Sequence, residues 1–157
     1  MPNWTTDLSR GKRGEDIISK RFNCQKADGR KYDLITPTGK TLEVKTDFYR
    51  MKETPNFAIE RFSNSKFETD GGIYKSAKDG VDRFAYFFFK DRVVYFWEVV
   101  DLMKEVEKYV KLNNQYRKTY VRNEKDGEEY YTLNYLIPRR HLEGACFRVE
   151  TIDKKYF

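Results

Sequence analysis

The sequence has few of the residues that build zinc sites and disulfide frameworks. It contains two cysteines, Cys24 and Cys146, a single histidine, His141, and no CxxC pair. A structural zinc site needs four Cys or His ligands, so this class of site is nearly excluded. Two widely spaced cysteines without a signal peptide are typical of reduced thiols, and the sequence therefore predicts a cytoplasmic protein.

Long apolar runs, internal repeats and low-complexity segments are also missing. The longest apolar run, Phe84 to Phe89, is far shorter than the roughly 20 residues that a membrane-spanning helix needs. We therefore expect no membrane partner. Aromatic residues, in contrast, make up 17% of the chain. They can fill a core despite the few aliphatic residues, so we expect one folded domain over residues 1–157.

Charged residues make up 36% of the chain, and the net charge is +6. This balance favours a polyanionic partner such as nucleic acid, although charge kept for solubility explains it equally well. The basic residues Lys12 and Arg13 lie on the first predicted helix. Lys118 and Arg122 alternate with tyrosines later in the chain, a pattern that suits phosphate contacts and base stacking. A solvated surface is the alternative for all four.

The order of the predicted elements indicates an α/β fold. The pattern predicts a helix over 7–22, strands over 22–27, 31–36, 40–48, 56–62, 83–90 and 92–100, and a helix over 101–110. Residues 111–129 are polar and basic and predict a long loop or mobile arm. Further strands are predicted over 130–137 and 146–152, separated by a short helix after Pro138. We therefore expect a mixed β-sheet flanked by helices, with a core at about 7–110 and a C-terminal extension, 111–157, packed on it.

The stretch from Asp33 to Lys45 is the most informative part of the sequence. Residues 37–39, Pro-Thr-Gly, predict a three-residue hairpin loop with Gly39 in the left-handed conformation. Such a loop pairs Thr36 with Lys40. Continuing the antiparallel pairing places Asp33 directly opposite Glu43, with Cβ atoms roughly 5 Å apart.

Lys45 follows Glu43 by two residues and is therefore expected on the same face of the strand. Two directly opposed carboxylates destabilise a hairpin unless a positive charge lies between them. A divalent cation bound by Asp33 and Glu43 would supply that charge. The alternative is an ordinary cross-strand salt bridge on a solvated face.

Glu43-Val44-Lys45 is the only E-x-K triplet in the chain. Together with Asp33 and with Glu15 in the preceding helix, it resembles the signature of the PD-(D/E)xK nuclease superfamily. The proline of that signature is replaced here by Tyr32. The resemblance implies a restriction-endonuclease-like core, in which a helix precedes a β-meander, over roughly residues 7 to 100.

The resemblance also implies a metal-dependent endonuclease and a set of catalytic residues. Asp33, Glu43 and Glu15 would bind Mg²⁺, for which Mn²⁺ can substitute, and Lys45 would contact the attacking water or the scissile phosphate. Magnesium prefers one or two carboxylates, waters and substrate phosphate, and it lowers the pKa of bound water. A nearby lysine can stabilise the transition state without competing for the metal.

Two further segments have a weaker resemblance to small phage-encoded and archaeal nucleases that are similar to Holliday-junction resolvases. One is residues 58–61, with Glu60, and the other is residues 71–76, with Lys75 as a candidate nucleic-acid contact. This resemblance implies branched or structured DNA as the substrate, a homodimer, and a phage-encoded protein acting in the bacterial cytoplasm. The alternative for Glu60 is a strand-surface charge paired with Arg61.

Two functions of other classes remain open at this point. One is a non-catalytic nucleic-acid-binding protein that retains the nuclease fold, and the other is an interaction or assembly protein with a fortuitous hairpin. Metal dependence separates them, because only the nuclease should bind Mg²⁺ or Mn²⁺ at Asp33 and Glu43 and cut DNA.

Overall fold

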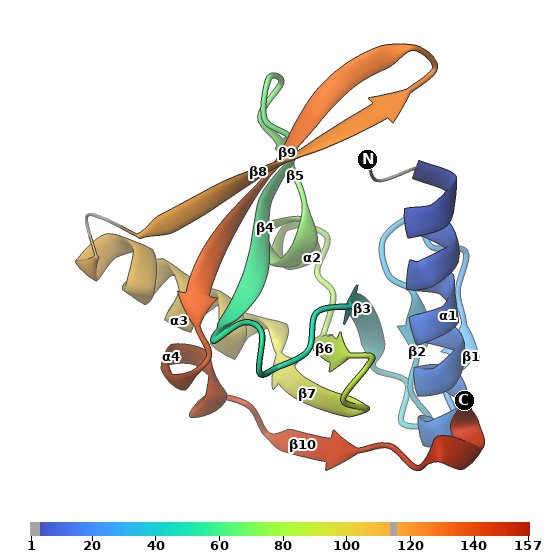
Figure 1. Cartoon of the computed structure of the whole chain (residues 1–157). Helices are drawn as coiled ribbons and strands as arrows, with labels where there is room; N and C mark the ends of the chain where they lie inside the picture. Colours follow the sequence, from blue (N-terminus) through green and yellow to red (C-terminus); the bar gives the residue numbers. More distant parts are fainter. Residues whose placement is uncertain (1–3, 114–115) are drawn as a thin grey trace.

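The computed structural model describes residues 4–113 and 116–157, with the backbone alone for residues 4–8. The chain forms two β-sheets with helices packed around them (Figure 1). The larger sheet has six strands in the order β1-β2-β3-β6-β7-β10. These strands are β1 (Gln25–Lys26), β2 (Leu34–Ile35), β3 (Thr41–Asp47), β6 (Arg83–Phe88), β7 (Val93–Glu98) and β10 (Arg148–Thr151).

The smaller sheet has four strands in the order β5-β4-β9-β8. These strands are β4 (Asn56–Asn64), β5 (Thr69–Asp70), β8 (Arg117–Lys125) and β9 (Glu128–Pro138). The helices are α1 (Trp4–Phe22), α2 (Gly72–Lys78), α3 (Val99–Leu112), α4 (Arg140–Glu143) and the short 3₁₀ helix η1 (Lys154–Tyr156). Among the described residues, no helix combines the length and the apolar character needed to cross a membrane.

The larger sheet is mixed. Strand β3 runs parallel to β6, while the other neighbouring strands are antiparallel. Parallel neighbours need a long connection, and here the chain between them forms β4, β5 and α2 before it returns as β6. The predicted α/β class, with a mixed sheet flanked by helices, is confirmed.

Each face of the larger sheet carries its own apolar cluster. On one face, Ile17 and Ile18 of α1 pack against Leu42, Phe87 and other buried residues of the strands. On the other face the strands meet the smaller sheet and helices α2, α3 and α4. Strands β6 and β7 are therefore covered on both sides, as their continuous apolar sequence predicts.

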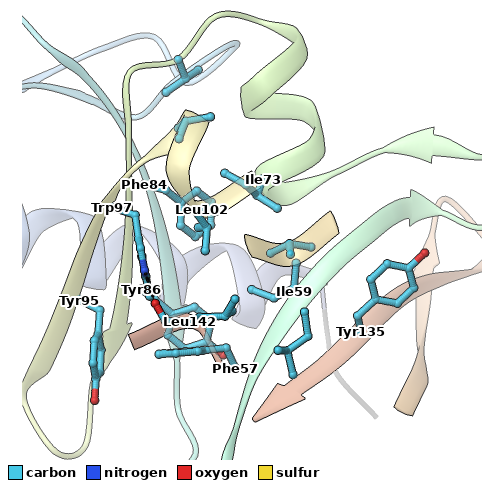
Figure 2. Packing of buried hydrophobic residues seen from close by; sticks show 14 of the residues in the cluster. Phe57, Ile59, Ile73, Phe84, Tyr86, Tyr95, Trp97, Leu102, Tyr135 and Leu142 are labelled. Carbon is cyan, nitrogen blue, oxygen red and sulfur yellow. Dashed lines mark hydrogen bonds between the residues drawn. The ribbon is translucent and has the colours of Figure 1, made fainter. Parts of the chain in front are cut away.

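Phe57 of β4 joins the smaller sheet to the larger one. Its ring lies 4.9 Å from that of Tyr86, 5.1 Å from Tyr95 and 5.2 Å from Trp97, each in an edge-on arrangement. Figure 2 shows Phe57 and Ile59 pointing from β4 toward these side chains. Edge-on aromatic pairs add about 0.5–1.5 kcal/mol each beyond their buried area. This cluster fixes β4 against the strands that follow the β2–β3 hairpin.

The sequence predicts three or four meandering strands, and the meander has three: it ends after β3, because β4 pairs with β5 and β9 in the smaller sheet rather than with β3. One prediction about the elements is wrong. Residues 111–129 do not form a long loop: α3 continues to Leu112, and β8 pairs along its whole length with β9. Polar β8 lacks a local strand signal, and its pairing partner supplies the structure. Residues 114 and 115 lie outside the described residues.

The C-terminal part of the chain contributes to both sheets. Leu133, Tyr135 and Ile137 of β9 are buried in the core, and β10 completes the larger sheet beside β7. Figure 1 shows the β8–β9 hairpin, drawn in orange, extending away from the larger sheet. Strand β8 also contacts α1. The first helix begins at Trp4, so Asp7 lies inside it and is not its N-terminal cap.

Candidate functional site

The β2–β3 hairpin has the predicted register. Leu34 pairs with Leu42, and the Thr36 N–H donates to the Lys40 carbonyl over 2.8 Å. Gly39 has a φ of +83°, the left-handed conformation that a three-residue loop requires of its last residue. The turn therefore sets the position of every residue that follows on β3.

The predicted direct opposition of Asp33 and Glu43 is wrong in its details. The paired residues of β2 extend no further than Leu34, so β3 has no strand partner on that side beyond Leu42. The Asp33 carboxylate takes the place of a strand and accepts the Val44 N–H over 2.8 Å. The backbone of β3 is satisfied by a side chain, and this brings the Asp33 carboxyl group beside that of Glu43.

Glu15 reaches the same place from helix α1. The helix can approach β3 closely because Gly14 has no side chain: a Cβ there would lie 1.9 Å from the Thr46 Oγ1. The contact places the next residue, Glu15, within hydrogen-bond reach of Asp33. Three carboxyl groups from α1, the β2 end and β3 therefore converge, with Asp33 in the middle.

Crowding raises the pKa values of two of these acids. Burial is the largest cause that raises the pKa of Glu43 to about 9, followed by repulsion from Asp33 and a hydrogen bond with it. Burial and then Asp33 also raise the pKa of Glu15 to about 7, although Lys26 and Lys12 act in the opposite direction. The raised pKa values favour the protonated forms of Glu43 and Glu15. Hydrogen bonds from these protonated groups to Asp33 then replace the repulsion between carboxylates.

A small cavity of about 100 Å³ lies beside the acids. Its polar side chains are Glu43 and Lys45 of β3 and Glu60 of β4, and its walls include Ile59, Ile73 and Phe84. The Lys45 side chain makes no hydrogen bond or ion pair with any described residue. The predicted catalytic residues Asp33, Glu43, Lys45 and Glu15 are therefore brought together by three elements of the fold.

Glu60 also lines this cavity. The sequence favours the alternative, a strand-surface charge paired with Arg61. Its expected partner, Arg61, pairs with Asp70 over 2.7 Å instead. The sequence signal that could have identified Glu60 is the Gly71-Gly72 pair. A Cβ at Gly71 would lie 2.2 Å from the Glu60 Oε2, so glycine leaves room for the carboxylate in this position.

The predicted nucleic-acid contacts on α1 and α2 lie near the acids. Lys12 and Arg13 are exposed on α1, and the Arg13 guanidinium lies 4.8 Å from the centre of the Phe89 ring. The Lys75 ammonium donates to the Arg30 carbonyl and to Asp79, and its charge also lowers the pKa of Glu43. Lys75 is therefore partly committed to bonds within the protein.

Lys118 and Arg122 lie on β8, far from this cluster in sequence. Lys118 is exposed, with its ammonium 5.3 Å from the centre of the Tyr116 ring. Arg122 is bound by Glu129 on β9, with 2.7 Å between Nε and Oε1. The β8–β9 strands thus carry charges of both signs, which weakens the case for a continuous phosphate-binding surface.

The donor chemistry of the three acids fits a hard divalent cation, because carboxylate oxygens are the ligands that Mg²⁺ and Mn²⁺ prefer. The side chains are not arranged around one point, however: within residues 9–113 and 116–157 no group of three or more His, Cys, Asp or Glu side chains is placed to hold an ion. Glu15 and Glu43 each meet Asp33 as hydrogen-bonded acids. A cation held here would replace those shared protons.

A scan against protein-family models matched no family, and a search of the curated proteins found no match. Function is therefore inferred from the chemistry of the site itself.

Proposed function

We propose that the protein is a metal-dependent endonuclease that hydrolyses phosphodiester bonds in DNA. The observation that carries this proposal is the convergence of Glu15, Asp33 and Glu43 next to Lys45 and an open cavity. Partly buried carboxylates that repel one another cost stability, and a purely structural role would not require them. The helix followed by the short β1–β2–β3 meander supports a restriction-endonuclease-like core.

Each of these residues has a chemical role in the proposed reaction. Asp33 and Glu43, with Glu15, would hold Mg²⁺, which supplies an activated water and neutralises charge on the phosphate. The Lys45 ammonium lies on the cavity side of β3, where it can donate to a phosphate oxygen as negative charge develops in the transition state. The Asp33–Val44 hydrogen bond holds the acid in place before substrate binds.

The net charge of +6 and the exposed Lys12 and Arg13 beside the acids support a polyanionic substrate. We further propose branched or structured DNA as the preferred substrate and a homodimer as the active form. Both rest on the resemblance to resolvase-like nucleases, since a four-way junction offers two symmetric cuts.

A cleavage assay tests the proposed activity. The substrates are linear duplex, single-stranded and four-way-junction DNA of matched sequence, each with Mg²⁺, Mn²⁺ or EDTA. We expect metal-dependent cutting that falls at least about 100-fold in Asp33→Asn, because a metal ligand is lost. Lys45→Ala should keep metal and DNA binding but lose cutting by about 100-fold or more.

Asp101→Asn is the matched control, since this exposed acid lies on α3 outside the site; it should cut at the wild-type rate. Wild-type-like cutting by Lys45→Ala would disprove the assignment of the site.

The second candidate function is a non-catalytic nucleic-acid-binding protein with the same fold. The mixture of basic and aromatic residues on β8, including Lys118 and the exposed Tyr120, favours it. Salt-dependent DNA binding without cutting, in every metal tested, would select this function instead.

A further inference from the structure

The cavity beside Lys45 contains one carboxylate that the proposed function does not use. We propose that Glu60 is the general base of the reaction, accepting the proton of the water that attacks the phosphate. The inference rests on the proposed nuclease function and names the residue that completes its chemistry. General bases of this kind contribute about 10²–10⁴-fold to enzymatic rates.

The lining of the cavity leaves Glu60 as the available proton acceptor. Only Glu43, Lys45 and Glu60 among the lining residues have ionisable side chains. A lysine ammonium has donors but no lone pair, and the proposed function already assigns Glu43 to the metal. The volume of about 100 Å³ accommodates several water molecules. Water within it is therefore bordered by a cation on β3 and by the Glu60 carboxylate on β4.

The Glu60 carboxylate is also free to act. It makes no hydrogen bond or ion pair with any residue in the described part of the chain. The adjacent Arg61 pairs with Asp70 at 2.7 Å and leaves Glu60 unpaired. Glu60 thus keeps acceptor capacity for a water molecule.

The backbone of two glycines packs closely against the Glu60 side chain. A Cβ at Gly71 would lie 2.2 Å from the Glu60 Oε2, and one at Gly72 would lie 3.0 Å from the Glu60 Cβ. Gly72 also has a φ of +51°, a conformation that other residues rarely adopt. Close packing of backbone against this side chain restricts its rotamers, so little ordering is needed when substrate binds.

The step balances without any further reagent. The water oxygen forms a bond to phosphorus, and one water proton passes to a Glu60 oxygen. The bond between phosphorus and the leaving oxygen breaks, and that oxygen takes a proton from solvent water. Glu60 then returns its proton to solvent, so one water is consumed and one phosphodiester is cut per cycle.

Single-turnover cleavage by Glu60→Gln and Glu60→Ala tests the proposal at saturating Mg²⁺ and DNA. Glutamine keeps the shape of the side chain against Gly71 but cannot take a proton. We expect the rate constant to fall about 10²–10⁴-fold in both variants, with DNA affinity, Mn²⁺ affinity and melting temperature close to those of the wild type. Sodium formate should restore a part of the Glu60→Ala rate, because the vacated space admits a small carboxylate.

Two controls separate catalysis from structure. Lys45→Ala should not respond to formate at matched ionic strength. Asp70→Asn removes the neighbouring Arg61–Asp70 ion pair and should keep the wild-type rate constant. Wild-type-like cutting by Glu60→Gln, or a Glu60→Ala variant that formate does not restore, would overturn the role of Glu60 and leave the nuclease proposal intact. A wild-type protein that cuts no substrate would overturn both.

Discussion

The two hairpins of this protein treat charge in opposite ways. In the β2–β3 hairpin, Asp33 and Glu43 meet as two acidic groups, partly buried and joined by Glu15 from α1. In the β8–β9 hairpin, Arg122 and Glu129 meet as opposite charges on an exposed surface, 2.7 Å apart. Both hairpins have regular pairing and a glycine in their turns.

The difference shows where charge is kept at a cost. Solvent screens an exposed ion pair, so the Arg122–Glu129 pair is nearly neutral for stability. Crowded carboxylates with a raised pKa destabilise the folded state wherever they ionise. A protein that keeps crowded acids gains something other than stability from them, and for the β2–β3 hairpin we infer cation binding.

The largest expected effect is a pH dependence of stability that comes from the acid hairpin. The pKa of Glu43 is raised on folding from an ordinary value of 4.5 to about 9, and that of Glu15 to about 7. The folded state therefore holds protons that the unfolded chain has lost between about pH 4.5 and 9. Stability should fall as pH rises through this window, by up to about 1.4 kcal/mol per pH unit for Glu43.

Thermal unfolding without metal at pH 5, 6.5 and 8 measures this dependence. Glu43→Gln should flatten it, and Mn²⁺ should raise the melting temperature most at pH 8, because the cation replaces the shared protons. Equal pH slopes for the wild type and Glu43→Gln would contradict the crowding of the acids.

A somewhat smaller effect is expected from Gly14→Ala. The added Cβ would lie 1.9 Å from the Thr46 Oγ1 and 2.9 Å from its Cβ, so helix α1 must move away from β3. Overpacking of this kind costs about 1–3 kcal/mol. Moving the helix also withdraws Glu15 from Asp33, so Mn²⁺ affinity should fall.

Chemical denaturation and Mn²⁺ titration measure the two effects of Gly14→Ala. Thr46→Ala in the same chain should restore part of both losses, whereas Gly11→Ala, at a position with open space around it, should leave Mn²⁺ affinity unchanged. Additive losses in the double variant would mean that the contact does not position the helix.

The smallest expected effect comes from the second hairpin. Arg122→Gln removes an exposed ion pair with Glu129 and should leave the free energy of unfolding almost unchanged, because solvent screens the pair. Lys118→Gln should change stability equally little, but it should reduce the salt dependence of DNA binding by about one counterion if Lys118 contacts a phosphate. A large loss of stability in Arg122→Gln would remove the contrast between the two hairpins.

Local signals predicted the acid hairpin and failed for the second sheet. The register from Thr36 to Lys40 follows from one turn, and the apolar runs of β6 and β7 identify buried strands directly. The pairing of β4 with β9 joins residues far apart in the chain, such as Asn56 and Pro138. Nothing near residue 56 indicates that partner, so the sequence alone leaves open whether the meander has three strands or four.

The same division applies to the site. Asp33, Glu43 and Lys45 are linked by a short hairpin, so their proximity is readable from sequence. The place of Glu60 depends on β4 leaving the meander and on Gly71 lying against it. The hydrogen bond from the Val44 N–H to the Asp33 carboxylate forms because β2 is only two residues long. The alternation of residues 31–36 does not reveal this short length.

The Tyr86 side chain connects β3 and β4, the two strands that carry the residues of the proposed reaction. The Tyr86 hydroxyl of β6 donates to buried Asp47 of β3 over 2.5 Å and accepts the Ala58 N–H of β4 over 3.0 Å. Strand β3 carries Glu43 and Lys45, and β4 carries Glu60. Sliding either strand by one residue would break this three-way joint, so Tyr86 sets the relative position of the strands that carry the proposed catalytic residues.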